Sequence, residues 1–158
     1  MNESVEQSKS SVLLWDNLSL RQVDQLVCRW VQNWRVFETE DELWKAKWHG
    51  FERIDIPFPY AYWSSLGDCY CVFYEDVMDA EPYLPSRSVD DALDLYEMPL
   101  FTNAACFFNK KSGRCHAKLR TVEKRSFHGN SGTLPLAICQ AVLTAYGIVS
   151  QTGEVYIP

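Results

Sequence analysis

Hydrophobic positions recur with the period of an α-helix in three segments of the chain. The first segment, residues 18–37, begins near Ser19, a residue type that caps helix N-termini. Its apolar face consists of Leu20, Val23, Val27, Trp30, Val31 and Trp34. Two tryptophans on one face indicate a helix that packs on a broad surface such as a sheet, and we expect both of them in the core.

The other two helices have clear start and stop signals. Ser88 precedes two acidic residues, which are favoured in a first helical turn, and Pro99 ends this segment. Thr133 is the expected cap of the last helix, "TLPLAICQAVLTAYG", and Gly147 is its expected end. The pattern therefore predicts helices near residues 89–98 and 134–146.

Alternating patterns predict strands. The clearest is a hairpin over residues 103–124, "NAACFFNKKSGRCHAKLRTVEK", with a Lys-Ser-Gly turn. After it, "FHGNSG" is predicted to be a glycine-bearing loop. Residues 42–63 are ambiguous, because Trp44 and Trp48 are four apart, as on a helix, whereas "WKAKW" also alternates. Since Pro57 and Pro59 bias the residues before them away from helix, we expect strands or a long aromatic loop there.

The order of elements predicts an α+β fold: a single-domain layered sandwich with a largely antiparallel sheet covered by about three helices. The 158 residues fit one domain, and 47% of them are hydrophobic, which is ample for a core. We assign residues 16–158 to this domain and residues 1–15 to a disordered or extended lead-in.

Composition favours a protein of the cell interior. No apolar run approaches the roughly 20 residues of a membrane span, and "MNESVEQSKS" does not resemble a signal peptide. The six cysteines lie within apolar runs, where a reduced cysteine acts as a small hydrophobic residue. We therefore expect reduced thiols, no membrane and a cytoplasmic location.

Positive charge is concentrated in one segment. Residues 110–128 contain seven lysines and arginines and one acid, whereas the remainder has 8 basic and 20 acidic residues. An acidic surface repels extended nucleic acid, so we expect a small anion or a basic contact point on a partner.

The segment "RCHAKLRTVEKR" is the candidate anion site. On a strand, alternate residues project to one face and lie about 6.6 Å apart, a spacing that suits several phosphate groups or a pyrophosphate. Arginine binds phosphate in bidentate fashion, and the following glycine loop and helix start offer free N–H groups. The expected ligands are Arg114, His116, Lys118, Arg120, Lys124, Arg125, His128 and Ser131. The alternative is a solvated strand face that pairs with the acidic segment 68–97.

No catalytic constellation is found, so we expect no enzyme, no cofactor and no metal. The three histidines are dispersed, and Cys115 and His116 are neighbours whose side chains point to opposite faces of a strand. Asp68, Glu75 and Asp76 near one strand are a minor candidate for a cation site.

Three segments resemble a known family. They are the early helix "LRQVDQLVCRWVQNW", the mid-chain "PYLPSRSVDDALDLYE" and the C-terminal "TLPLAICQAVLTA". Together they are similar to the phage ABA sandwich domain, a family of small bacteriophage proteins. The resemblance implies a phage origin and a compact fold in the cytoplasm of the infected bacterium, and it implies no activity.

Two functions from different classes remain open. One is a non-enzymatic counter-defence sponge that sequesters a nucleotide-derived immune signal, with exposed Tyr60, Tyr62 and Trp63 stacking a base and a homo-oligomer building the pocket. The other is an inhibitor that docks its acidic surface on a host defence protein.

Overall fold

The chain contains both helices and strands. The structure is a computed structural model that describes residues 12–76 and 79–158. In these residues the α-helices are α1 (Leu20–Leu26), α2 (Glu40–Lys47), α3 (Val89–Asp94) and α4 (Leu134–Ala145). The strands are β1 (Arg35–Phe37), β2 (Trp48–His49), β3 (Glu52–Arg53), β4 (Tyr60–Ser64), β5 (Cys69–Phe73), β6 (Glu81–Tyr83), β7 (Phe101–Asn109), β8 (Arg114–Thr121) and β9 (Ser126–Ser131).

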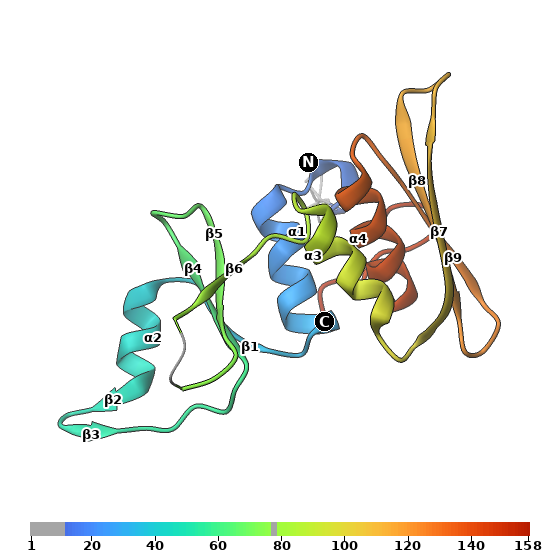
Figure 1. Cartoon of the computed structure of the whole chain (residues 1–158). Helices are drawn as coiled ribbons and strands as arrows, with labels where there is room; N and C mark the ends of the chain where they lie inside the picture. Colours follow the sequence, from blue (N-terminus) through green and yellow to red (C-terminus); the bar gives the residue numbers. More distant parts are fainter. Residues whose placement is uncertain (1–11, 77–78) are drawn as a thin grey trace, which may run out of the picture.

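The strands form separate sheets rather than one (Figure 1). Four strands pair in the order β1-β4-β5-β6, with β1 parallel to β4 and the other pairs antiparallel. The last three strands, β7-β8-β9, form an antiparallel meander, and β2 and β3 form a small ribbon. The prediction of a mixed, largely antiparallel α and β protein is confirmed, but the single sheet that we expected is wrong.

The helices α1, α3 and α4 lie between the two larger sheets (Figure 1). Their apolar side chains join those of both sheets in one buried cluster, which includes Val23, Val72, Ala92, Leu119 and Ile138. Helix α2 lies outside this cluster and covers the opposite face of the four-stranded sheet. There it forms a second, smaller cluster, which consists of Phe37, Leu43, Ile56 and Tyr60.

The predicted caps are confirmed by side-chain hydrogen bonds. The hydroxyl of Ser19 accepts from the backbone N–H of Gln22 at 3.1 Å, and Ser88 and Thr133 cap α3 and α4 in the same way. These bonds satisfy N–H groups that the first helical turn leaves without partners. At the other end of α4, Gly147 has a φ of 76°, as a helix-ending glycine requires.

The first helix ends earlier than the apolar pattern predicts. After α1 the chain forms a π-helical turn, Val27–Val31, in which Gln32 donates to the carbonyl of Val27. The extra residue in this turn rotates the following positions around the helix axis. Within the turn Trp30 is 37% exposed, so the expectation that it packs in the core is wrong, whereas Trp34 packs edge-on against Tyr83.

Two segments adopt structures that the sequence pattern did not predict. Residues 40–47, expected as strand or loop, form helix α2, which Thr39 caps and which begins with three acidic residues. The segment 127–132, expected to be a loop, lies almost entirely in strand β9, Ser126–Ser131. Exposed and buried positions alternate along the whole strand. The buried positions include Gly129 and Ser131, which are not hydrophobic, so the sequence shows no alternating hydrophobic pattern.

Most of the predicted lead-in, residues 1–11, lies outside the described residues. The part that is described is bonded to the C-terminal segment. Trp15 N–H donates to the carbonyl of Gly153 at 2.8 Å, and Val155 N–H donates to Leu13 at the same distance. The Trp15 side chain is buried. These contacts place residues 13–15 with the folded domain rather than with a lead-in.

Helix α4 lies unusually close to β9 at Gly129. A β carbon at this position would lie 1.8 Å from the carbonyl oxygen of Ala137 and 2.9 Å from the backbone nitrogen of Ala141. Real side chains do not approach backbone atoms this closely, so only glycine fits between the strand and the helix.

Asp24 is a fully buried acid of α1. Its Oδ1 accepts a 2.8 Å hydrogen bond from the backbone N–H of Ser86, while Oδ2 and the Ser86 hydroxyl have no partner among the described residues. Burial raises the pKa of the Asp24 carboxyl to about 6, and the hydrogen bond from the Ser86 backbone N–H and the charge of Arg87 oppose this rise.

The contact at Gly129 predicts a large effect of one added methyl group. Gly129→Ala is expected to lower the free energy of unfolding by about 3 kcal/mol, because the backbone of α4 must move away from the sheet. Gly132→Ala is the control, since its β carbon meets no described atom within 4 Å, and it should change stability by less than about 0.5 kcal/mol. Chemical denaturation measures both variants, and equal effects would contradict the close contact.

Asp24 predicts a pH-dependent loss of stability. Its folded-state pKa lies above its value of 3.8 in the unfolded chain, so its stabilising contribution is complete below about pH 4 and is lost as the pH rises through 6. Between pH 4 and 7 the wild type should therefore lose about 3 kcal/mol of unfolding free energy relative to the Asp24→Asn variant. Urea denaturation across this range measures the difference, and parallel pH profiles would show that Asp24 is not the cause.

Candidate anion-binding site

The β7–β9 sheet has one packed face and one open face. Helix α4 covers the packed face, where Ala117 and Leu119 of β8 are buried. Residues between them in sequence project the other way, because side chains alternate along a strand. The strand register arranges these open-face residues in rows across the three strands, and we call this surface the basic face. Its rows are Asn103–Arg120–Ser126, Ala105–Lys118–His128 and Phe107–His116–Asn130.

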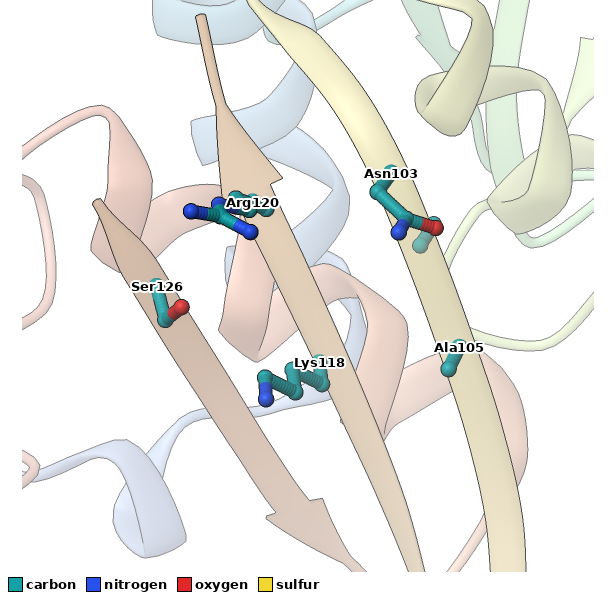
Figure 2. A pocket seen from close by; sticks show the side chains of 6 residues that line it. Asn103, Ala105, Lys118, Arg120 and Ser126 are labelled. Atoms are coloured by element: carbon teal, nitrogen blue, oxygen red, sulfur yellow. The ribbon is translucent and has the colours of Figure 1, made fainter. Parts of the chain in front are cut away.

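A shallow hollow lies on the basic face between its first two rows (Figure 2). Its volume is about 220 Å³. Lys118 and Arg120 project into the same space from β8, with Asn103 and Ala105 on one side and Ser126 on the other (Figure 2). Ala105 has a short side chain, which leaves room between the two cations and β7.

The two cations at the hollow carry uncompensated charge. Lys118 and Arg120 are exposed, and neither forms an ion pair with an acid in the part of the chain that the structure describes. The acidic segment 68–97 does not pair with β8, whose neighbours are β7 and β9. An arrangement of free Lys and Arg side chains with polar neighbours can bind an anion through charge-assisted hydrogen bonds.

Four of the eight predicted ligands lie on the basic face in rows: His116, Lys118, Arg120 and His128. Arg114 has the same alternation on β8, but its guanidinium is bonded to Asn130 at the end of the third row and does not line the hollow. Its Nε donates to Oδ1 of Asn130 at 2.6 Å, and its Nη2 donates to the Asn130 carbonyl at 3.0 Å.

The remaining three predicted ligands do not join the hollow. Lys124 lies in the β8–β9 turn, where its φ is 63°. Arg125 stacks its guanidinium 5.2 Å from the ring of Phe127, which is buried on the packed side. Ser131 is also buried there, and its hydroxyl accepts from Nε1 of Trp15 at 3.1 Å. The N-terminus of α4 follows on this side, away from the open face.

The three aromatic residues expected to stack a base lie in β4, in the other sheet (Figure 1). Tyr60 is 1% exposed, so the expectation of an exposed ring is wrong for this residue. Tyr62 stacks on Phe73, and Trp63 packs edge-on against Tyr70. The structure therefore does not bring these rings to the basic face.

Sequence reasoning missed an aromatic pair on the basic face itself. The rings of Phe107 and His116 are stacked, with centroids 4.9 Å apart and planes inclined by 13°. Asn103 and Ser126, which line the hollow, were also missed. The alternation of side chains along β7 could have identified Asn103 and Phe107, because residues 103, 105 and 107 share a face with their β8 partners.

Two of the buried titratable groups elsewhere in the fold are thiols. Burial raises the pKa of the Cys28 and Cys139 thiols, and a protonated thiol is a poor nucleophile. The six cysteines are free, and no group of three metal-ligating side chains occurs in residues 12–76 and 79–158. Of the minor cation candidate, Asp68 and Asp76 pair with Arg87 and Arg53 respectively.

The comparisons with known proteins bear on the fold alone. No model of a known protein family matches the sequence, and a search of curated proteins finds no match. The fold is similar to that in the crystal structure of a phage protein from Bacillus cereus, with a TM-score of 0.50 and 11% identity. The similarity covers 83% of this chain and 90% of that chain. Within the described residues, no helix combines the length and apolar character of a membrane span.

Proposed function

We propose that this protein is a non-enzymatic phage counter-defence sponge, which binds and sequesters a nucleotide-derived immune signal on its basic face. The observation that carries the proposal is the pair of exposed, unpaired cations, Lys118 and Arg120, over a hollow of about 220 Å³. Phosphate is the ligand chemistry that such a pair recognises, since arginine binds it through two N–H groups and lysine adds a point charge.

The charge distribution supports a small ligand. Outside the segment 110–128 acidic residues outnumber basic ones by twelve, so a long nucleic acid that leaves the basic face meets repulsion. A nucleotide of one or two units fits within the basic face and does not reach the acidic surface.

The phage origin in this proposal is supported by the similarity to the Bacillus cereus phage protein. The alternating layers of sheet and helix support a layered sandwich, in the order sheet, helices, sheet. On this view the protein acts in the cytoplasm of the infected bacterium. Because the hollow is open to solvent, a second copy that covered it would close the site, so the proposal includes a homo-oligomer.

Ligand binding is tested by thermal shift with cyclic dinucleotides and ADP-ribose derivatives. A sponge should show a higher melting temperature with at least one of them, because a ligand that binds only the folded state stabilises it. Lys118→Ala with Arg120→Ala should weaken binding about tenfold or more while leaving the melting temperature of the free protein unchanged, since neither side chain has a partner to lose.

The matched control removes the same charge from the β7–β8 turn, with Lys110→Ala and Lys111→Ala. The turn lies about 13 Å along the strand from Lys118, beyond the Debye length of about 8 Å at physiological ionic strength. This variant should bind as the wild type does. Equal loss in both double variants, or no shift with any nucleotide, would contradict the site.

A sponge also returns its ligand unchanged. Mass spectrometry of the small molecule released when the loaded protein is heated should find the mass that was added. A changed mass would identify an enzyme and refute the non-enzymatic part of the proposal.

The second candidate, an inhibitor that docks on a host defence protein, has its own structural support. Helix α2 begins with Glu40, Asp41 and Glu42, and the exposed side chains of Trp44, Trp48 and Phe51 follow along the helix and the β2–β3 ribbon. A surface with both acids and exposed aromatics suits a basic protein partner. Loss of counter-defence in Trp44→Ala with Phe51→Ala, but not in Lys118→Ala with Arg120→Ala, would favour this candidate over the sponge.

A further inference from the structure

One row of the basic face is aromatic. Phe107 of β7 and His116 of β8 are directly opposite in the strand register, and their rings are stacked in near-parallel planes 4.9 Å apart. Their row borders the row of Ala105 and Lys118, which leads to the hollow. An aromatic pair and two cations therefore follow one another along a single open surface.

Phe107 is not explained by the packing of the fold. Its side chain is 58% exposed on the face that α4 does not cover. Exposure of a large apolar ring beside charged side chains costs free energy unless something covers the ring. A nucleobase is a suitable cover, because every nucleobase is flat and stacks on aromatic side chains.

The rows also set a spacing between groups. Along β8 the aromatic row, Lys118 and Arg120 succeed one another at about 6.6 Å intervals. The pyrophosphate expected from the sequence does not match this spacing, because its two phosphorus atoms share one oxygen and lie much closer together. Two phosphates separated by a sugar, as in a phosphodiester-linked dinucleotide, match the separation of the two cations better.

We infer that the Phe107–His116 pair is the base-binding part of the site, and that its ligand is a short phosphodiester-linked nucleotide. One base stacks on the aromatic pair, and the two phosphates that follow bind Lys118 and Arg120. This inference rests on the proposed function, and it replaces the β4 aromatics with residues that lie on the basic face.

The chain offers a close control for Phe107. The next residue, Phe108, is 59% exposed, but it pairs with Cys115 and projects from the other face of β7. Phe107→Ala and Phe108→Ala therefore remove rings of the same size and the same exposure from opposite faces of one strand.

The test measures calorimetric binding of two probes: the linear dinucleotide pApA and the same phosphate backbone with abasic sugars. We expect the wild type to bind pApA about tenfold more tightly than the abasic backbone, because a stacked base contributes that much or more. Phe107→Ala should bind both probes equally, and Phe108→Ala should behave as the wild type does.

The outcomes separate this inference from the function on which it rests. If pApA binding depends on Lys118 and Arg120, but the abasic backbone binds equally well or the two phenylalanine variants behave alike, the base-binding role is overturned and the anion site stands. If neither pApA nor any nucleotide in the thermal-shift panel binds the wild type, the proposed function fails and the inference fails with it.

Discussion

The close contact between α4 and β9 is the constraint on which the rest of this structure depends. At Gly129 the strand backbone lies so near the helix backbone that a single methyl group does not fit. The contact fixes α4 against one face of the β7–β9 sheet, and α4 in turn supplies the interior with buried residues such as Ile138 and Val142. The opposite face of the sheet is left without a cover, and this is where the basic residues lie.

Alternation along β8 separates the residues that stabilise the fold from the exposed cations. Ala117 and Leu119 are buried and contribute to the core, since burial of a leucine side chain is worth roughly 1.5–3 kcal/mol. The intervening Lys118 and Arg120 contact no acid of the described chain and contribute little to the fold. A strand of this kind can keep its fold while the residues of its open face are replaced, which makes that face suitable for a ligand site.

Local signals in the sequence predicted the helix caps and the β7–β8 hairpin. Ser19, Ser88 and Thr133 succeed as predictors because a cap depends on bonds within three residues. Strand β9 was missed because two of its buried residues are not hydrophobic. Gly129 allows the close approach of α4, and Ser131 accepts a hydrogen bond from Trp15. Helix α2 was missed because its pattern also alternates, and because Trp44 and Trp48 are exposed.

The candidate site was predictable in part, because the alternation of side chains along a strand is also a local property. Alternation places His116, Lys118 and Arg120 on one face once β8 is known to be a strand. It does not show that Arg125 turns to Phe127, that Arg114 binds Asn130, or that β4 lies in another sheet. These are long-range or competing contacts, and the spacing of residues along one strand contains no information about them.

The central claim is that the open face of the β7–β9 sheet is the anion-binding surface. Amide proton–nitrogen correlation spectra recorded during a titration with pApA test it most directly. The account predicts that the largest shift changes cluster in β7, β8 and β9, around Ala105, Lys118 and Arg120. Changes confined to the α2–β3 region or to β4, or a spectrum that the nucleotide leaves unaltered, would contradict it.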